Sequence, residues 1–157
     1  MIYVLYGQPS AGKTTLGKIL KEHLKTPFII DGDEFREMFA NKNYGKEGRE
    51  ENIRNANAVA TYLNKVRGRS WSGVLGQFDG LVLEDVVMTL VNPYGYLREE
   101  LERNNRSEVI QVLLKSRRES KKEYHVKDFE VGHPHYIIST DRDVEETWES
   151  LKDLLRV

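Results

Sequence analysis

The sequence predicts an α/β protein whose helices cover both faces of a doubly wound, mostly parallel sheet of five strands. Short apolar runs typical of buried parallel strands alternate with longer segments in which apolar residues recur at helical spacing. A glycine-rich loop separates the first apolar run from the first helical segment. The chain contains no internal repeat, low-complexity tract or linker, so we expect residues 1–157 to form a single domain.

The apolar runs place the five strands at residues 2–6, 27–30, 85–91, 108–114 and 136–139. The first helix follows the glycine-rich loop and carries an apolar stripe at Leu16, Ile19, Leu20 and Leu24. Further helices are predicted over 34–40, 49–64 and 96–104, and a last helix is expected to bury Val144, Trp148, Leu151 and Leu155. Residues 65–84 show no clear period, and we interpret them as an insertion of unknown role that forms a small hairpin or an irregular excursion.

Residues 7–15 match the phosphate-binding pattern GxxxxGK[ST], which is the signature of P-loop NTPases. Gly7 and Gly12 allow the backbone to curl so that its N–H groups point at phosphate oxygens, and the following helix adds its positive dipole end. Lys13 supplies a cation for the β- and γ-phosphates, and Thr14 offers a hydroxyl to Mg²⁺. We therefore expect ATP and Mg²⁺ as cofactors, with ATP bound by Gly7, Ser10, Ala11, Gly12, Lys13, Thr14 and Thr15.

Two carboxylates, Asp31 and Asp33, follow the second predicted strand. Ligands of open α/β sheets bind beyond the carboxyl ends of the strands, so both aspartates are expected beside the phosphate loop. A carboxylate in that position can bind Mg²⁺, together with Thr14, or act as a general base. Which of the two is the base stays open.

Composition excludes several functional classes. The net charge of −1 gives no overall basic field for nucleic acid or an anionic membrane. The absence of cysteine excludes disulfides, thiolate zinc sites and cysteine nucleophiles, and no apolar run is long enough to span a bilayer. Because ATP is intracellular and the first strand begins at once, we expect a cytoplasmic protein without a signal peptide and without a membrane partner.

Residues 115–123 carry five basic and two acidic side chains. Such a run is either a solvated helix face or part of a mobile lid that closes cations over the transferring phosphoryl group. We favour a lid over residues 115–132, with Arg117 as an ATP-binding residue. The histidines at 125, 133 and 135 lack helical metal-ligand spacing.

Four sequence blocks together resemble the adenylylsulfate kinases, which transfer the γ-phosphate of ATP to the ribose 3′-hydroxyl of adenylyl sulfate. The blocks are the loop 7–15, Asp31-Gly32-Asp33 with Arg36, residues 49–54, and Asn92-Pro93-Tyr94 with Arg98. They occur in the family's order and span nearly the first two thirds of the chain. The resemblance implies a phosphotransferase with an alcohol group as acceptor.

The resemblance also implies roles for individual residues. Lys13, Asp31 and Asp33 would be catalytic, one carboxylate orienting Mg²⁺-bound water and accepting the proton of the attacking hydroxyl. The residues implied in binding adenylyl sulfate are Arg36, Arg49 and Asn52 for the phosphosulfate and ribose, Tyr44 and Phe129 as a sandwich around the adenine, and Lys122 in the lid. Kinases of the family are often dimers, so a homodimer is a possible assembly.

The chain departs from the family in a shorter lid, in Asn92 where the family has serine, in Gly48 where the family has aspartate, and in the insertion 65–84. One alternative is a kinase of the same build that acts on a modified nucleotide, a hydroxymethylated base in DNA or a polynucleotide end. Arg67, Arg69 and Trp71 would then contact nucleic acid. A second alternative is a nucleotide-binding regulator without turnover.

Overall fold

The computed structural model describes residues 1–66, 84–118 and 122–157. Its strands form one sheet in the order β2-β3-β1-β4-β5, and all four strand pairs are parallel. The strands are β1 (Ile2–Tyr6), β2 (Phe28–Asp31), β3 (Val86–Leu90), β4 (Val109–Lys115) and β5 (Tyr136–Ser139). The predicted α/β fold with a parallel sheet is therefore confirmed.

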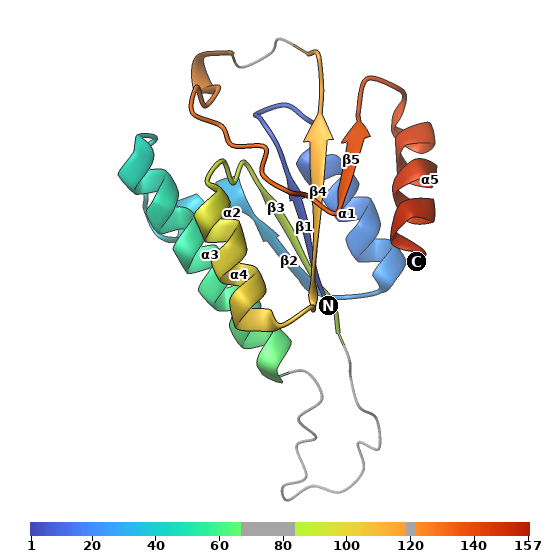
Figure 1. The fold of residues 1–157 in the computed structure, drawn as a ribbon, viewed down its shortest axis with the longest axis horizontal. Coiled ribbons are helices and arrows are strands. Elements are labelled where there is room, and N and C mark those ends of the chain that lie inside the picture. Colours follow the sequence, from blue (N-terminus) through green and yellow to red (C-terminus); the bar gives the residue numbers. More distant parts are fainter. Residues whose placement is uncertain (67–83, 119–121) are drawn as a thin grey trace, which may run out of the picture.

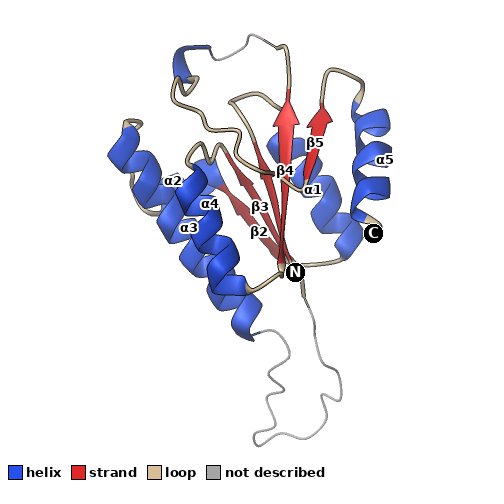
Figure 2. Ribbon diagram, viewed as in Figure 1, coloured by secondary structure: helices blue, strands red, loops and turns tan. Residues whose placement is uncertain are grey.

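Helices cover both faces of the sheet, as predicted (Figure 1). The helices α1 (Lys13–Leu24) and α5 (Val144–Leu155) lie on one face. The helices α2 (Gly32–Met38), α3 (Lys46–Val66) and α4 (Gly95–Asn105) lie on the other, and a single 3₁₀ turn, η1, spans Lys122–Tyr124. Figure 2 shows the strands enclosed between the two helical layers.

The position of β1 at the centre of the sheet explains why its sequence is continuously apolar. Ile2, Val4 and Tyr6 face the hydrophobic cluster under α3 and α4, whereas Tyr3 and Leu5 face the cluster under α1 and α5. All five residues are buried. A strand with helices on both faces has no solvent side, so the alternation of polar and apolar residues disappears.

Helix α1 approaches the sheet closely at Gly17. A Cβ atom at this position would lie 2.2 Å from Cγ2 of Thr89 on β3, so only glycine fits. The close approach brings the first turn of α1 beside the carboxyl ends of β2 and β3. It thereby positions the phosphate loop next to Asp31 at the end of β2 and Asp33 two residues later.

The structure corrects one expectation about the last helix, and in the described part of the charged run it does not show the helix that was the less favoured alternative to a lid. Val144 is 45% exposed, because it is the first helical residue after the N-cap Asp143 and points to solvent, whereas Leu151 and Leu155 are buried and Trp148 is half-buried. In the charged run, residues 116–118 form a loop. The η1 turn follows, so the described part of this run is no continuous helix.

The boundaries of α2 and α3 also differ from prediction. α2 begins at Gly32, because Asp31 caps its N-terminus, and α3 spans Lys46–Val66. Most of the predicted insertion lies outside the described residues, including Arg67, Arg69 and Trp71. Within the described ranges no helix is long and apolar enough to cross a membrane.

Candidate active site

The phosphate loop connects β1 to α1 with two residues in left-handed backbone conformation, Ser10 (φ 65°) and Gly12 (φ 80°). Gly12 caps α1 without a side-chain hydrogen bond, and no acidic residue lies in the first turn of the helix. The first N–H groups of α1 are therefore available to an anion. Thr140, which follows β5, braces the loop because its hydroxyl donates to the carbonyl of Ala11 over 3.1 Å.

Lys13 lies folded over the phosphate loop. Its ammonium Nζ donates a hydrogen bond to the main-chain carbonyl of Gln8 over 2.7 Å. This contact keeps the cation beside the curled backbone that the sequence identifies as a phosphate cradle. Both Lys13 and the neighbouring Thr14 line the same cavity.

Asp31 is the most heavily hydrogen-bonded carboxylate beside the loop, and it is only 6% exposed. Its Oδ2 accepts hydrogen bonds from the hydroxyls of Thr14 and Thr89, each over 2.7 Å. Its Oδ1 caps α2 by accepting from the amides of Asp33 at 3.1 Å and Glu34 at 3.4 Å. Burial by itself would raise the pKa of Asp31, but these hydrogen bonds outweigh it and hold the pKa below the ordinary aspartate value.

Asp33 has a different environment two residues further along. It lies in the first turn of α2, is exposed, and lines the cavity beside Lys13 and Thr14. The two aspartates, equivalent in the sequence pattern, are thus a buried hydrogen-bonding hub and an accessible carboxylate.

A cavity of about 1040 Å³ lies above the carboxyl ends of β1, β2 and β3. Most predicted site residues line it, namely Ser10, Gly12, Lys13, Thr14, Thr15, Asp31, Asp33, Arg36, Tyr44, Arg49 and Asn52. Gly7 and Ala11 belong to the loop but do not line the cavity; a Cβ at Gly7 would lie 2.4 Å from the carbonyl oxygen of Leu114. The side chain of Lys122 lies outside the described part of the structure.

Arg36 forms a buried cation in the cavity wall opposite the phosphate loop. It is 8% exposed, and its Nη1 donates to the carbonyl of Asn43 over 2.7 Å and to Oδ1 of Asn41 over 3.2 Å. Its guanidinium lies 4.6 Å from the ring centroid of Tyr44. Burial lowers the pKa of Arg36, and Arg49 lowers it further, but arginine remains charged. This wall therefore suits an anion.

The aromatic pair at the cavity differs from the predicted one. Tyr44 faces Tyr124, with ring centroids 5.8 Å apart, and both side chains are about half exposed. Phe129, the expected partner of Tyr44, does not line the cavity; its ring stacks on Tyr6 at 6.2 Å and packs against the core cluster of β1. The expected sandwich of Tyr44 and Phe129 is not formed.

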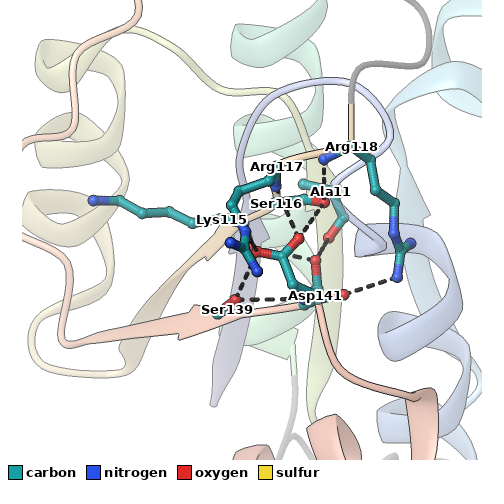
Figure 3. Close-up of polar contacts among 8 residues, drawn as sticks. Ala11, Lys115, Ser116, Arg117, Arg118, Ser139 and Asp141 are labelled. Carbon is teal, nitrogen blue, oxygen red and sulfur yellow. Dashed lines mark hydrogen bonds and ion pairs between the residues drawn. The ribbon is translucent and has the colours of Figure 1, made fainter.

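Adjacent arginines after β4 point in different directions (Figure 3). Arg117 pairs with Asp141 through Nε and Oδ2 at 3.1 Å and does not line the cavity. Arg118 donates through Nη2 to the carbonyl of Thr140 over 2.8 Å and does line it. Of these two arginines, Arg118 rather than the predicted Arg117 brings a cation to the cavity.

The cavity residues that sequence reasoning omitted from the predicted site include Thr89, Asn92, Arg118 and Tyr124. Asn92 is 1% exposed and has a left-handed backbone (φ 45°), and neither polar atom of its side chain has a hydrogen-bond partner among the described residues. Its place directly after a buried strand was a usable signal, because ligands bind at this edge. Thr89 was a usable signal too, because it is the one polar residue of β3, whose sequence is Val-Val-Met-Thr-Leu.

A protein-family model described as "AAA domain" matches residues 6–69, which contain the phosphate loop, both aspartates, Arg36, Arg49 and Asn52. No curated protein sequence matches the chain significantly.

Solved structures match over nearly the whole chain. The APS kinase of Mycobacterium tuberculosis, in complex with AMPPNP and APS, matches at 17% identity and a TM-score of 0.74, covering 99% of this chain and 97% of that one. A gluconokinase from Sinorhizobium meliloti matches at 15% identity and a TM-score of 0.62, covering 98% of this chain and 91% of that one. The shikimate kinase of Aquifex aeolicus matches at 17% identity and a TM-score of 0.59, covering 99% of this chain and 96% of that one. The chain thus has the fold of P-loop kinases whose named members phosphorylate different acceptors.

Proposed function

We propose that this protein is an ATP-dependent kinase that transfers the γ-phosphate of ATP to a hydroxyl group, with adenylyl sulfate as the favoured acceptor and its 3′-phosphate as the product. The observation that carries the proposal is the hydrogen bond between Asp31 and Thr14, which holds the turn Asp31–Asp33 against the phosphate loop. A phosphate on the loop and a hydroxyl beside Asp33 would then meet in one cavity.

The residues present suit Mg²⁺ bound together with ATP. The hydroxyl of Thr14 donates its only proton to Asp31, so its lone pairs remain for a cation. The described residues contain no cluster of three or more His, Cys, Asp or Glu that could hold a metal, which agrees with an ion held mainly by water and phosphate. Thr14, with Asp33 through water, would hold Mg²⁺, which neutralises phosphate charge when bound, and Asp31 would orient the Thr14 hydroxyl rather than bind the ion.

Asp33 is the better candidate for the general base. The four hydrogen bonds to Asp31 use about all the lone pairs that a carboxylate offers, and they lower its pKa. Asp33 is open to the cavity and can accept the proton of an attacking hydroxyl. Asp31 then acts as a positioning residue that fixes Thr14 and the first turn of α2.

The acceptor end of the cavity favours an anion with a planar group. Arg36 and Arg49 supply positive charge on one wall, and Asn52 contributes a buried amide that donates to the carbonyl of Gly32 over 3.2 Å. Tyr44 and Tyr124 present two rings on which a purine can stack. Adenylyl sulfate combines both features. On the ATP side, Arg118 takes the place that we expected for Arg117.

A second candidate is a kinase for a hydroxyl group in nucleic acid, such as a polynucleotide end or a hydroxymethylated base. It is favoured by the rings at the cavity, which are half-exposed tyrosines rather than the expected pair with Phe129. Exposed rings beside the cationic Arg36 and Lys42 are typical of surfaces that bind single strands. This candidate predicts acceptor binding that weakens steeply with salt.

The test is ADP release from Mg·ATP in the presence of adenylyl sulfate, nucleosides, nucleotides and oligonucleotides, with Lys13→Ala as the blank. Stimulation by adenylyl sulfate alone supports the first candidate. Stimulation by an oligonucleotide supports the second candidate instead. Stimulation by another small metabolite alone would retain the kinase activity and contradict both proposed acceptors. No stimulation by any acceptor, with ATP still bound, would indicate a regulator and contradict the proposal.

A further inference from the structure

The side chain of Gln8 fastens the phosphate loop to a distant segment of the chain. Its Nε2 donates to the carbonyl of Val126 over 2.8 Å, and its Oε1 accepts from the amide of Val126 over 3.0 Å. The carboxamide thus satisfies both main-chain groups of one residue, as a neighbouring strand would. Val126 is buried, so if these bonds are lost, water cannot replace them as hydrogen-bond partners of its main-chain amide and carbonyl.

Val126 lies two residues after Tyr124, which lines the cavity and contacts the ring of Tyr44. The intervening chain is too short to let Tyr124 move far while Val126 is fixed. Gln8 does not line the cavity. Its side chain therefore acts at a distance, by fixing the point from which the Tyr124 ring reaches the cavity.

The remainder of the segment is held by other contacts further along. The hydroxyl of Tyr6 donates to the carbonyl of Val131 over 2.7 Å, and Arg98 donates to the carbonyl of Glu130 over 2.7 Å. These contacts lie four and five residues beyond Val126. Among the described contacts of this segment, the pair between Gln8 and Val126 is therefore the side-chain attachment next to Tyr124.

We propose that Gln8 is a positioning residue that holds Tyr124 over the acceptor end of the cavity and so favours acceptor binding. The inference rests on the proposed kinase function. The main-chain carbonyl of Gln8, which accepts from Lys13, is independent of the side chain. Replacement of the side chain is therefore expected to affect the acceptor and to leave the affinity for Mg·ATP unchanged.

The experiment compares Gln8→Met, which keeps the length of the side chain and removes both hydrogen bonds, with the wild type. The KM for adenylyl sulfate is expected to rise roughly tenfold, and the Kd of Mg·ATP to stay within about twofold. Gln8→Glu keeps the acceptor for the Val126 amide but repels the Val126 carbonyl, so it is expected to raise KM as well. Gln111→Met, which removes a buried glutamine contact to Glu102 away from the cavity, is the matched control.

A double-mutant cycle with Tyr124→Ala separates this role from a general effect on the loop. Because Gln8 acts through Tyr124, Gln8→Met is expected to change the acceptor KM by less than about twofold in the Tyr124→Ala background. Independent effects of the two changes on KM would overturn the inference. A parallel rise in the Kd of Mg·ATP would overturn it too.

Amide hydrogen exchange at Val126 gives a readout that does not depend on turnover. Exchange at this amide is expected to be faster in Gln8→Met and unchanged in Gln111→Met. If the wild type phosphorylates no acceptor, the proposed function fails. If the wild type phosphorylates adenylyl sulfate but Gln8→Met has the same KM and the same exchange, only the positioning role of Gln8 fails.

Discussion

The hydroxyl of Thr14 donates a hydrogen bond to the carboxylate of Asp31 over 2.7 Å, and this contact joins the phosphate loop to the end of β2. The same carboxylate accepts from Thr89 on β3 and caps α2. The ends of β2 and β3 and the first turns of α1 and α2 are therefore fixed to one buried group. The arrangement leaves Asp33, at the first turn of α2, as the carboxylate that a ligand can reach.

Asp33→Asn is expected to lower kcat by roughly 100-fold or more, because an amide cannot accept the proton of the attacking hydroxyl. The free energy of unfolding should stay within about 0.5 kcal/mol of the wild type, since Asp33 is exposed. Steady-state ADP release and urea unfolding measure the two quantities. Asp153→Asn, at an exposed position on α5, is the control. Unchanged turnover in Asp33→Asn would exclude this residue as the base.

Asp31→Asn is expected to lower the free energy of unfolding by about 2 kcal/mol, because the new amide group faces hydrogen-bond donors in a buried site. The pKa of Asp31 is depressed in the folded state, so its contribution is complete above the ordinary aspartate pKa of about 4 and is lost as the pH falls below that value.

The measurement for Asp31 is urea unfolding of the wild type and Asp31→Asn between neutral pH and about pH 3. The difference in free energy between the two proteins should shrink as the pH falls below about 4. A difference that stays constant over this range would contradict the depressed pKa of Asp31.

Arg118→Ala is expected to raise the KM for ATP about tenfold, because Arg118 brings a cation to the cavity. Arg117→Ala should leave that KM nearly unchanged, since Arg117 pairs with Asp141 outside the cavity. The two adjacent substitutions control for each other in one assay. The reverse order of effects would restore the assignment made from the sequence.

Phe129→Ala is expected to lower the free energy of unfolding by about 2 to 3 kcal/mol, because its ring packs on Tyr6 against the core. Tyr124→Ala should leave stability nearly unchanged and raise the KM of the acceptor, because its ring is half exposed and lines the cavity. Thermal unfolding measures the loss of stability expected in Phe129→Ala, and acceptor titrations measure the rise in KM expected in Tyr124→Ala. An acceptor KM that depends on Phe129 but not on Tyr124 would contradict this assignment.

The fold was predictable because the sequence of each strand or helix has a pattern of apolar residues that indicates its structure. The continuous apolar run of β1 and the stripe of α1 each indicate their structure without reference to the rest of the chain. The prediction that Val144 is buried was wrong because the spacing of apolar residues does not show where a helix begins. Asp143 is the N-cap, so Val144 is the first helical residue and faces solvent.

The site was predictable where a motif fixes the backbone, and less so elsewhere. The aspartates 31 and 33 look equivalent in the sequence, and only the capping contacts of Asp31 separate their roles. Arg117 and Arg118 differ by one position in a loop, where no period predicts which side chain reaches the cavity. Phe129 lies in an irregular segment, so its packing on Tyr6 depends on tertiary contacts.

Transfer of the label from [γ-³²P]ATP tests the central claim most directly. Wild-type protein is incubated with Mg²⁺, labelled ATP and adenylyl sulfate, and the nucleotides are then separated. A kinase acting on adenylyl sulfate places the label at its 3′-position, at a rate that falls roughly 100-fold in Asp33→Asn. Label that remains in ATP or appears only as inorganic phosphate, with every acceptor offered, would contradict the assignment of this protein as a kinase.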